Sequence, residues 1–447
     1  MSRMFGTDGV RGIAGHDLSP SLAFKLGRAG AYVLSQKTSH PKILVGKDTR
    51  LSGDMLENAL IAGILSAGAT AISLGVLPTP AVAYLTRIRN AAAGVVISAS
   101  HNPAEYNGIK FFSGDGYKLP DAVEDEIQRV IEEDAVPVYT GADIGRAYHD
   151  TTAVEDYMAF AAKTISVRLD NMRLAVDCAN GAAYKISPSV FEALGASVTA
   201  IHTEPNGLNI NADCGSTHLE SLCDTVRNGN YDLGIAFDGD ADRVLLVDEC
   251  GNPISGDAMM VACAIHLKEK GKLSNNTLVA TIMSNLGLSI ACKKHGISTV
   301  ETAVGDRYVL EAMLKGGHCL GGEQSGHIIF SEHATTGDGL VSALQFLSVM
   351  QESKKTASAL ASTVHILPQV LENAVVSPEK KHLYKTDAVI CAEISRIEKK
   401  LAGCGRVVIR PSGTEPNVRI MLEGDNIAVL KEEALALAGL IETRMQA

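Results

Sequence analysis

The feature that most constrains the fold of this chain is a pattern that occurs three times, at residues 43–74, 174–201 and 278–300. Each copy has a short β-rich run, a polar or glycine-containing turn, a helix with apolar periodicity, a glycine, and a second β-rich run. A strand, a helix and a second strand joined by short turns form the crossover unit of parallel sheets. Each copy therefore predicts a mostly parallel sheet covered by helices.

The distances between the copies favour three related domains. The glycines that end the three helices, Gly68, Gly195 and Gly296, are 127 and 101 residues apart. A chain of 447 residues is long enough for about three or four compact units, at roughly 150 residues per domain.

After about residue 366 the pattern changes. A charged helix over residues 385–401 precedes two strand-like runs, 406–409 and 418–422, and a helix rich in Ala, Leu and Glu follows. We therefore predict an α/β fold with three related domains, whose mostly parallel mixed sheets are covered by helices, and a smaller C-terminal α+β domain with an antiparallel pair. The predicted domains cover residues 1–152, 153–253, 254–366 and 367–447.

Composition excludes several classes of protein. A net charge of -11 and few aromatic residues, 11 Tyr and 9 Phe without Trp, argue against a nucleic-acid partner. The nine cysteines are odd in number and never form a C-x-x-C pair, which disfavours a disulfide scaffold and a zinc cluster. No apolar stretch approaches the roughly 18 residues that cross a bilayer, and the start lacks a secretory signal. We expect a cytoplasmic protein with no membrane partner.

The most informative segment is residues 94–103, in which a buried strand leads directly into Ser98, Ser100 and His101. Such a sequence presents a serine at the carboxyl end of a sheet, where ligands bind in α/β folds. Lys110 follows closely. An ordinary Ser/Asn turn is the alternative. A Ser-His-Asp hydrolase would need a G-x-S-x-G elbow, which the chain does not contain.

A second segment places Asp238, Asp240 and Asp242 before Arg243, between two strand-like runs. Three carboxylates so close together repel one another unless a cation neutralises them, and oxygen ligands select a hard ion such as Mg²⁺ or Ca²⁺. An EF-hand is excluded because Arg243 occupies the position that requires glycine and the flanks are strands rather than helices. A solvated acidic turn is the alternative.

Two further turns predict binding sites. Residues 321–327 place Glu323, Ser325 and His327 among glycines, which suits the neighbouring hydroxyls of a sugar. Residues 410–417, with Arg419 beyond them, combine arginine, hydroxyls and backbone N–H groups around a glycine, which suits a phosphate. A plain glycine-rich turn and a surface turn are the respective alternatives.

These four segments, in this order and one from each predicted domain, resemble the α-D-phosphohexomutase superfamily over essentially the whole chain. Within the superfamily the chain is similar to bacterial members that interconvert glucosamine 6-phosphate and glucosamine 1-phosphate. That closer similarity rests on residues 5–12, 209–218, 304–308 and 335–339.

The resemblance implies a role for each matched residue. Ser100 would carry the phosphoryl group, and Mg²⁺ would be held by Asp238, Asp240, Asp242 and one oxygen of the phosphate on Ser100. Strand alternation places Ser98 and Ser100 on one face, so the resemblance and the start of the turn select Ser100. The other catalytic residues would be Lys110, His327, Arg11 and Arg243. The substrate would be bound by Glu323, Ser325, Arg410, Ser412, Gly413, Thr414 and Arg419.

The implied reaction passes through a bisphosphate that turns over in the site, and its product feeds the synthesis of UDP-N-acetylglucosamine and the cell wall. Three alternatives stay open: a phosphomannomutase or phosphoglucomutase with the same mechanism, a Mg²⁺-dependent phosphatase, and a non-catalytic sugar-phosphate sensor. The expected partner is a small phosphosugar, and the oligomeric state is left open, a homodimer included.

Overall fold

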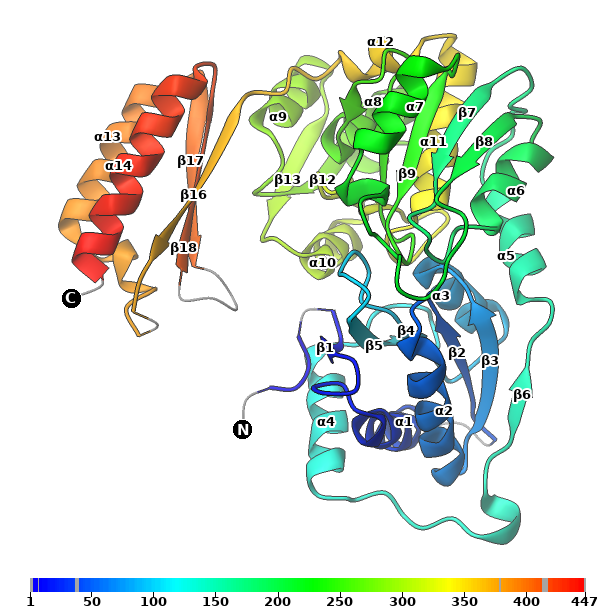
Figure 1. Ribbon diagram of the computed structural model, residues 1–447. Coiled ribbons are helices and arrows are strands. Elements are labelled where there is room, and N and C mark those ends of the chain that lie inside the picture. The colour runs from blue at the N-terminus through cyan, green and yellow to red at the C-terminus, as the bar shows by residue number, and fades with distance from the viewer. Residues whose placement is uncertain (1–2, 7, 37–39, 378, 412–416, 446–447) are drawn as a thin grey trace.

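The computed structural model describes residues 3–6, 8–36, 40–377, 379–411 and 417–445. Over these residues the strands form four sheets, which follow one another along the chain (Figure 1). The first three sheets are mixed and are covered by helices, and the fourth is smaller and antiparallel. The predicted fold class is confirmed. Within the described residues, no helix is long and apolar enough to span a membrane.

The first sheet has the order β1-β5-β4-β2-β3-β6, in which β4, β2, β3 and β6 are parallel and β5 and β1 are antiparallel additions. Its strands are β1 (Val10–Ile13), β2 (Lys42–Lys47), β3 (Thr70–Val76), β4 (Ala93–Ile97), β5 (Tyr106–Ser113) and β6 (Ala147–His149). Its helices are α1 (Pro20–Ser35), α2 (Ser52–Ser66), α3 (Thr79–Ile88) and α4 (Asp121–Glu132). Because β2 and β4 are parallel neighbours, the turns that follow them meet at one edge of the sheet.

The second sheet has the order β11-β10-β9-β7-β8. Its strands are β7 (Arg173–Asp177), β8 (Ser197–Ile201), β9 (Leu233–Phe237), β10 (Val244–Val247) and β11 (Pro253–Ile254), and its helices are α5 (Ala153–Ala162), α6 (Ile186–Ala193) and α7 (Glu220–Asn228). Strands β9 and β10 form an antiparallel pair. The turn between them carries the three aspartates that the sequence singled out.

The third sheet has the order β13-β12-β14-β15. Its strands are β12 (Thr277–Thr281), β13 (Ser298–Thr302), β14 (Leu320–Gly322) and β15 (Ile328–Phe330). The helices of this part are α8 (Gly256–Glu269), α9 (Leu286–Lys294), α10 (Asp306–Gly316), α11 (Gly339–Ser353) and α12 (Ala357–Ala361). The antiparallel hairpin of β14 and β15 presents the loop from Glu323 to His327.

The fourth sheet has the order β16-β18-β17 and is antiparallel throughout. It comprises β16 (Gln369–Val375), β17 (Gly405–Pro411) and β18 (Asn417–Gly424), with α13 (Ala388–Leu401) and α14 (Ile427–Met445). The expected antiparallel pair is present as β17 and β18. Strand β16 was not expected, because Glu372 and Asn373 interrupt its short apolar pattern. Short 3₁₀ turns occur at Gly141–Asp143, Gly215–Thr217, Ser274–Asn276 and Leu383–Lys385.

Several helices begin where the sequence supplies a capping side chain. The Ser19 hydroxyl accepts a hydrogen bond from the Leu22 N–H at the start of α1, and Pro20 occupies the first helical position. The Asp338 carboxylate accepts from the Val341 N–H at the start of α11. These side chains satisfy backbone donors that have no partner within the helix. They fix the ends of helices that border the turns described below.

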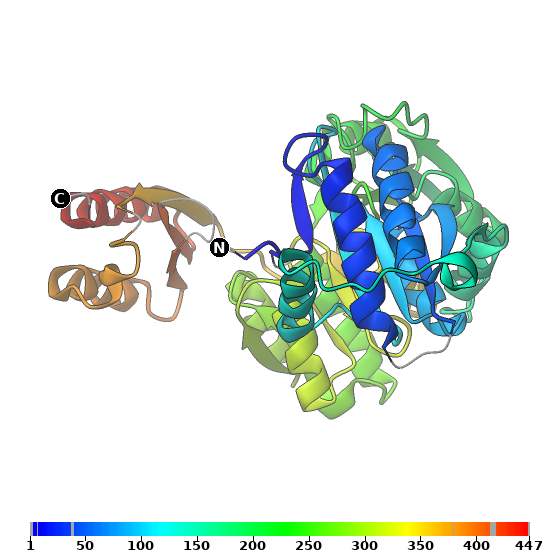
Figure 2. The same ribbon diagram turned by 90° about the horizontal axis from the view of Figure 1, so that it is seen from below.

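The hydrophobic core divides the molecule unevenly. One continuous cluster extends from Leu44 to Val364 and joins one face of the first sheet to the second and third sheets. The tyrosine hydroxyl of Tyr157, on α5, also lies 2.9 Å from the carboxylate of Asp338 across this core. Helices α1, α2 and α4 bury a separate cluster, within residues 5–136, against the other face of the first sheet. The fourth sheet and its two helices bury a separate cluster, confined to residues 374–445. In both views this part stands beside the rest of the molecule (Figures 1 and 2).

Candidate active site

Ser100 follows β4 at the edge where the turns after β2 and β4 meet, and its side chain is fully buried. Its hydroxyl donates to Asp238 Oδ2 at 2.6 Å, across the boundary between the first and second sheets. The Ser98 hydroxyl instead donates to Asp48 Oδ2 at 2.6 Å and accepts from the Ser100 N–H at 3.0 Å. Alternation along the strand left the two serines equivalent. The structure distinguishes them, because only Ser100 contacts the acidic turn.

The backbone of this serine loop is held by an arginine that the sequence analysis did not select. Arg50 follows β2, its side chain is completely buried, and its Nε donates to Asp48 Oδ2 at 2.9 Å. Its terminal nitrogens donate to four backbone carbonyls of the loop, those of Ser100, Asn102, Pro103 and Tyr106. Ser100 has a positive φ of 54°, which is uncommon for a residue with a Cβ. The clamp by Arg50 supports this conformation.

Asp238, Asp240 and Asp242 are buried, and one carboxylate oxygen of each lies within 4.8 Å of the others. Burial, and then the charges of the other two aspartates, raise the pKa of Asp238 well above its usual range. Asp240 Oδ1 and Asp242 Oδ1 are buried without a hydrogen-bond partner among the described residues. Buried carboxylates with unpaired oxygens fit a hard divalent cation. The three aspartates are therefore suited to bind a metal ion.

Lys110, on β5, faces the same carboxylates from the first sheet. Its Nζ lies 2.9 Å from Asp240 Oδ2, 3.2 Å from Asp8 Oδ2 and 3.9 Å from Asp242 Oδ2. Burial opposes a charge on this amine, but the three carboxylates outweigh burial and raise the pKa of Lys110. The lysine is therefore held as a cation directly beside the acidic turn.

His327 approaches the acidic turn from the third sheet and is almost completely buried. Its Nδ1 lies 3.7 Å from Asp242 Oδ2 and its Nε2 lies 3.5 Å from Asp306 Oδ2. The Gly337 N–H donates to Nε2 at 3.0 Å, so the neutral ring carries its proton on Nδ1, toward Asp242. Burial lowers the pKa of His327, but Asp242 and Asp306 outweigh it and the net pKa is raised.

Arg243 follows the acidic turn and contacts the serine loop through His101. The distance from the Arg243 terminal nitrogen to His101 Nδ1 is 3.1 Å. Burial, and then the charges of Arg243 and Arg11, lower the pKa of His101 to about 4. The neutral imidazole therefore accepts a hydrogen bond from the guanidinium at neutral pH.

A second set of charges connects the first and third sheets, and of its members the sequence analysis selected Arg11 but not Asp8, Lys118 or Asp306. Asp8 pairs with Arg11, and its Oδ1 lies 2.6 Å from Lys118 Nζ. Lys118 also forms an ion pair with Asp306 at the start of α10. Burial opposes ionisation of Asp8, but Lys110, Lys118 and Arg11 hold its pKa well below the usual range. The chain of ion pairs positions Arg11 at the mouth of the site.

A cavity of about 730 Å³ lies over this arrangement and receives residues from all four sheets or their turns. This volume suits a small ligand. Ser100 and Lys110 are buried beneath it rather than in its lining. The lining includes Arg11, Lys118, Asp242, Arg243, Asp306, Glu323, His327 and Arg410.

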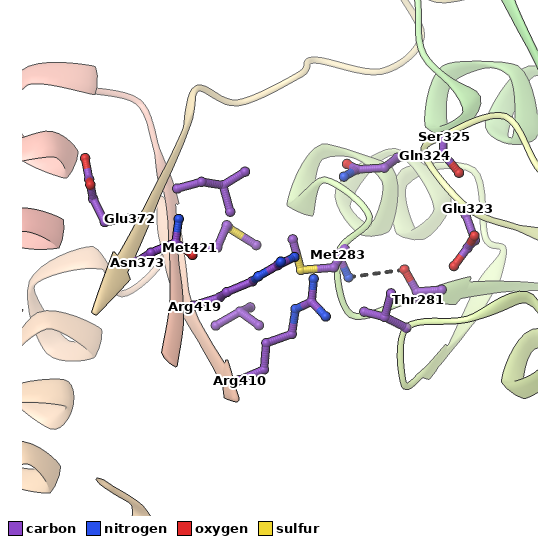
Figure 3. A pocket seen from close by; sticks show the side chains of 13 residues that line it. Thr281, Met283, Glu323, Gln324, Ser325, Glu372, Asn373, Arg410, Arg419 and Met421 are labelled. Carbon is purple, nitrogen blue, oxygen red and sulfur yellow. Dashed lines mark hydrogen bonds between the residues drawn. The ribbon is translucent and has the colours of Figure 1, made fainter. Parts of the chain in front are cut away.

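The fourth sheet contributes two arginines. Arg410 on β17 and Arg419 on β18 are directly opposite each other in the antiparallel register. Like charges in such a pair are unfavourable without an anion, and burial and then Arg419 lower the pKa of Arg410. Both side chains point from the fourth sheet toward Thr281 and Met283 of the third part (Figure 3).

Between these two parts lies a further cavity of about 360 Å³, whose lining includes Glu323, Ser325, Arg410 and Arg419. The Glu323 carboxylate accepts a hydrogen bond from the Gly305 N–H at 3.0 Å. Ser412, Gly413 and Thr414, which the sequence predicted to bind phosphate, lie outside the described residues.

Comparisons with known proteins place the whole chain in one family. Models of the phosphoglucomutase/phosphomannomutase family match in order: alpha/beta/alpha domains I, II and III and the C-terminal domain match residues 2–136, 155–251, 255–366 and 371–440. The phosphoglucosamine mutase of Clostridium novyi (strain NT) is 60% identical over 449 residues, which cover 100% of both chains. The chain belongs to the phosphoglucosamine mutases. It is an isomerase, an intramolecular phosphotransferase. The resemblance to the α-D-phosphohexomutase superfamily that the motifs indicated is confirmed.

Solved structures show the same fold. A phosphoglucomutase/phosphomannomutase family protein from Burkholderia thailandensis has a TM-score of 0.83 at 22% identity, covering 99% of this chain and 98% of its own. The N-acetylphosphoglucosamine mutase of Aspergillus fumigatus, in complex with GlcNAc-6P and magnesium, has a TM-score of 0.70 at 17% identity, covering 99% of this chain and 96% of its own.

Proposed function

We propose that the protein interconverts glucosamine 6-phosphate and glucosamine 1-phosphate through a phosphoserine at Ser100 and a glucosamine 1,6-bisphosphate intermediate. The observation that carries this proposal is the 2.6 Å contact between the Ser100 hydroxyl and Asp238, within a buried group of three carboxylates beneath a cavity to which all four parts contribute. This contact supports the assignment of Ser100 as the nucleophile for phosphoryl transfer, next to the proposed cation site.

Mg²⁺ is the proposed cofactor. Asp238, Asp240, Asp242 and one oxygen of the phosphate on Ser100 would hold it, and when bound it would neutralise charge on the transferring phosphoryl group. The two unpaired carboxylate oxygens at Asp240 and Asp242 support this ligand set. The Aspergillus fumigatus relative, whose complex contains magnesium, has the same fold.

The residues of the chain itself supply positioning and charge. Lys110 and His327 hold protons beside the acidic turn, and we assign them as acid/base or charge-stabilising groups near Ser100. Arg243 and Arg11 line the cavity and are assigned to offset charge on the phosphoryl group. Because all four side chains are fixed by ion pairs or burial, the site needs little reorganisation when substrate binds.

Substrate recognition is assigned to the cavity of about 360 Å³, whose lining includes Glu323, Ser325, Arg410 and Arg419. Glu323 and Ser325 would hold the sugar O3 and O4 hydroxyls, which exchange places when the bisphosphate turns by about half a revolution. The C2 amine moves to a different place, so we expect imperfect discrimination at C2. The phosphate that is not reacting would be bound by Arg410, Ser412, Gly413, Thr414 and Arg419.

The proposed setting is the cytoplasm, where the product would feed UDP-N-acetylglucosamine and cell-wall synthesis. A homodimer is the assembly to test, by light scattering of the purified protein.

The deciding experiment combines two measurements on the purified full-length chain. Intact mass before and after phosphatase treatment should show the loss of one phosphoryl group. Initial rates on glucosamine, glucose and mannose 6-phosphates should be highest for the glucosamine compound. A higher rate on mannose or glucose phosphate would reassign the substrate, and release of free phosphate in step with turnover would indicate a phosphatase. An unphosphorylated protein that stays inactive after treatment with a hexose 1,6-bisphosphate would contradict the mechanism.

A further inference from the structure

A second group of ligand-type side chains lies at the carboxyl edge of the second sheet, separate from the three active-site aspartates. Asp177 ends β7, His202 follows β8, and Cys214 precedes the 3₁₀ turn Gly215–Thr217. One ligand atom of each lies within 4.8 Å of the others. Strands β7 and β8 are parallel neighbours, with Asp177 opposite Ile201, so the residues that follow them meet at one edge. Asp177 and Cys214 are buried, and His202 is partly buried.

The atoms of this group are oriented toward one another, but their hydrogen bonding is incomplete. Asp177 Oδ1 accepts from the Ala179 N–H at 2.9 Å and Oδ2 accepts from the Gly215 N–H at 2.8 Å, which fixes the carboxylate and leaves each oxygen a lone pair. His202 Nδ1 lies 3.0 Å from Asp177 Oδ1, yet this buried nitrogen forms no hydrogen bond of acceptable geometry among the described residues. Cys214 Sγ accepts a long hydrogen bond from Asn180 Nδ2, at 4.0 Å.

We propose that Asp177, His202 and Cys214 bind a transition-metal ion, with Zn²⁺ as the preferred ion. Thiolate, imidazole and carboxylate together form the donor set of zinc, whereas the all-oxygen active-site group suits Mg²⁺. A carboxylate and a thiolate balance the charge of a divalent ion, so the buried site is neutral overall. The backbone N–H groups on Asp177 act as the outer hydrogen bonds that orient a metal-binding carboxylate. Three protein ligands leave a fourth position for water.

Cysteine spacing could not reveal this site. The absence of C-x-x-C pairs argues against a zinc cluster made of cysteine pairs, but here a single cysteine joins ligands that the sheet topology brings together. The competing explanation is a simple ion pair between protonated His202 and Asp177. That explanation gives Cys214 no role and predicts no bound metal.

The proposed metal site is connected to the serine loop through Asn211. Asn211, between His202 and Cys214 in the chain, donates through its Nδ2 to the Ser100 carbonyl at 2.9 Å and to the Asn102 carbonyl at 3.1 Å. Its own N–H donates to the Ala179 carbonyl at 2.9 Å. A metal ion at this point would tie the turn after β7 to the segment that holds the Ser100 backbone. The ion is thus assigned a positioning role that does not involve substrate.

The test uses the full-length protein, depleted of metal and then loaded with Co²⁺ while excess Mg²⁺ occupies the active-site carboxylates. Cobalt bound to a thiolate gives a charge-transfer band in the near ultraviolet, which oxygen ligands alone do not produce. We expect this band in the unaltered protein and its loss in Cys214→Ala and in His202→Asn. Asparagine tolerates the positive φ of residue 202, so the second variant keeps the backbone conformation.

The matched control is Cys263→Ala, which removes another buried thiol, on α8, and should keep the band. After dialysis with Zn²⁺ and Mg²⁺, the Cys214→Ala protein should retain one zinc ion fewer per chain than the control. A protein without the cobalt band, or a band that survives in Cys214→Ala, would overturn the proposal. Neither result would affect the proposed mutase activity, which is measured separately on sugar phosphates.

Discussion

Asp238 and Asp242 lie four residues apart in one turn, yet their surroundings act on them in opposite directions. Burial and the charges of its two neighbours raise the pKa of Asp238 well above its usual range. Burial also opposes ionisation of Asp242, but His327, Lys110 and Arg243 outweigh it and lower its pKa. At neutral pH the Asp238 carboxylate therefore destabilises the metal-free protein, whereas the Asp242 carboxylate stabilises it.

This contrast predicts opposite effects of two isosteric changes. Asp238→Asn should raise the melting temperature in chelator, because a pKa raised in the folded state costs stability above the unfolded pKa and asparagine removes that charge. Asp242→Asn should lower it, because a lowered pKa contributes stability that the amide cannot supply. Both variants should lose mutase activity with Mg²⁺ present. Calorimetry in chelator measures both melting temperatures. Equal changes in melting temperature for the two variants would contradict the prediction.

The two serines give a second matched pair. Ser100→Ala should abolish both the phosphoryl group seen by peptide mapping and the mutase activity. Ser98→Ala should keep the phosphate on residue 100, because the Ser98 hydroxyl contacts Asp48 and the Ser100 N–H rather than the acidic turn. A phosphate mapped to Ser98, or full activity in Ser100→Ala, would show that the later serine is not the nucleophile.

Ser100 could be predicted from the sequence because it comes shortly after an apolar strand. The three aspartates could be predicted because they alternate within one turn between two strands. Arg50, Asp8 and Lys118 could not be predicted. Their function depends on partners more than 45 residues away, such as the carbonyl of residue 100 for Arg50 and Asp306 for Lys118. Charged residues after β2 were a usable signal, since a neighbouring parallel strand places them beside Ser100. The catalytic and binding roles of all these residues stay predictions.

The start of α11 carries an unusual cap. Asp338 accepts hydrogen bonds from the Val341 N–H and the Tyr157 hydroxyl, but complete burial raises its pKa to about 6. Its contribution to stability is therefore present below the unfolded pKa and is lost as the pH rises through about 6. Because the pKa of Asp338 is about two units above its usual value, this loss of stability amounts to about 3 kcal/mol.

Asp338→Asn should remove this pH dependence, because asparagine caps a helix without titrating. The free energy of unfolding of the unaltered protein should fall between pH 4 and 7 more steeply than that of the variant. Urea denaturation at several pH values measures both. Parallel pH profiles for the two proteins would show that Asp338 does not titrate in this range.

The turn after β2 is the second element whose contribution can be measured. Arg50→Lys should lower the rate of phosphoryl transfer strongly with little change in KM, because lysine cannot reach four loop carbonyls and leaves buried acceptors unpaired, each at about 1 to 3 kcal/mol. The melting temperature should fall as well. Arg129→Lys, at exposed pairs with Glu126 and Glu133, is the control and should leave both quantities unchanged. An unchanged kcat in Arg50→Lys would remove the clamp from the mechanism.

Elements with long apolar periodicity were predictable, and the three parallel strand pairs lie where the repeated pattern placed them. Strand β16 was not, since a short exposed strand with polar residues differs little from a loop in sequence. The packing of the second and third sheets into one core with the first was also not predictable, because the same apolar patterns would cover separate cores. The boundaries near residues 152, 253 and 366 stay predictions.

The cavity of about 730 Å³ is lined by residues from all four sheets or their turns, but these four parts of the molecule are not equally connected. The first three share one core, whereas the fourth is joined mainly by polar contacts near α9. The Leu286 N–H donates to the buried Glu423 carboxylate at 3.1 Å, and Asn285 and Leu367 exchange hydrogen bonds of 2.9 and 3.0 Å. A small polar junction beside residue 366 suits a hinge.

A bisphosphate that must turn without escaping needs a site that loosens and closes again, and a mobile part that binds phosphate provides it. Arg410→Ala should raise KM, since a charge-assisted contact contributes roughly 1.5 to 3 kcal/mol. Arg444→Ala, an exposed pair with Asp387 in the same part, is the control.

Truncation after residue 366 should have the stronger effect. The core of the first three parts does not include the fourth, so the shortened chain should fold and keep Ser100 beside Asp238. Without Arg410 and Arg419 the distal phosphate loses its binding site, so mutase turnover should collapse while bisphosphate accumulates in solution. Chromatography of the reaction mixture separates the bisphosphate from both monophosphates. Interconversion of glucosamine 6-phosphate and 1-phosphate by the shortened chain at the full-length rate would remove the fourth part from the mechanism.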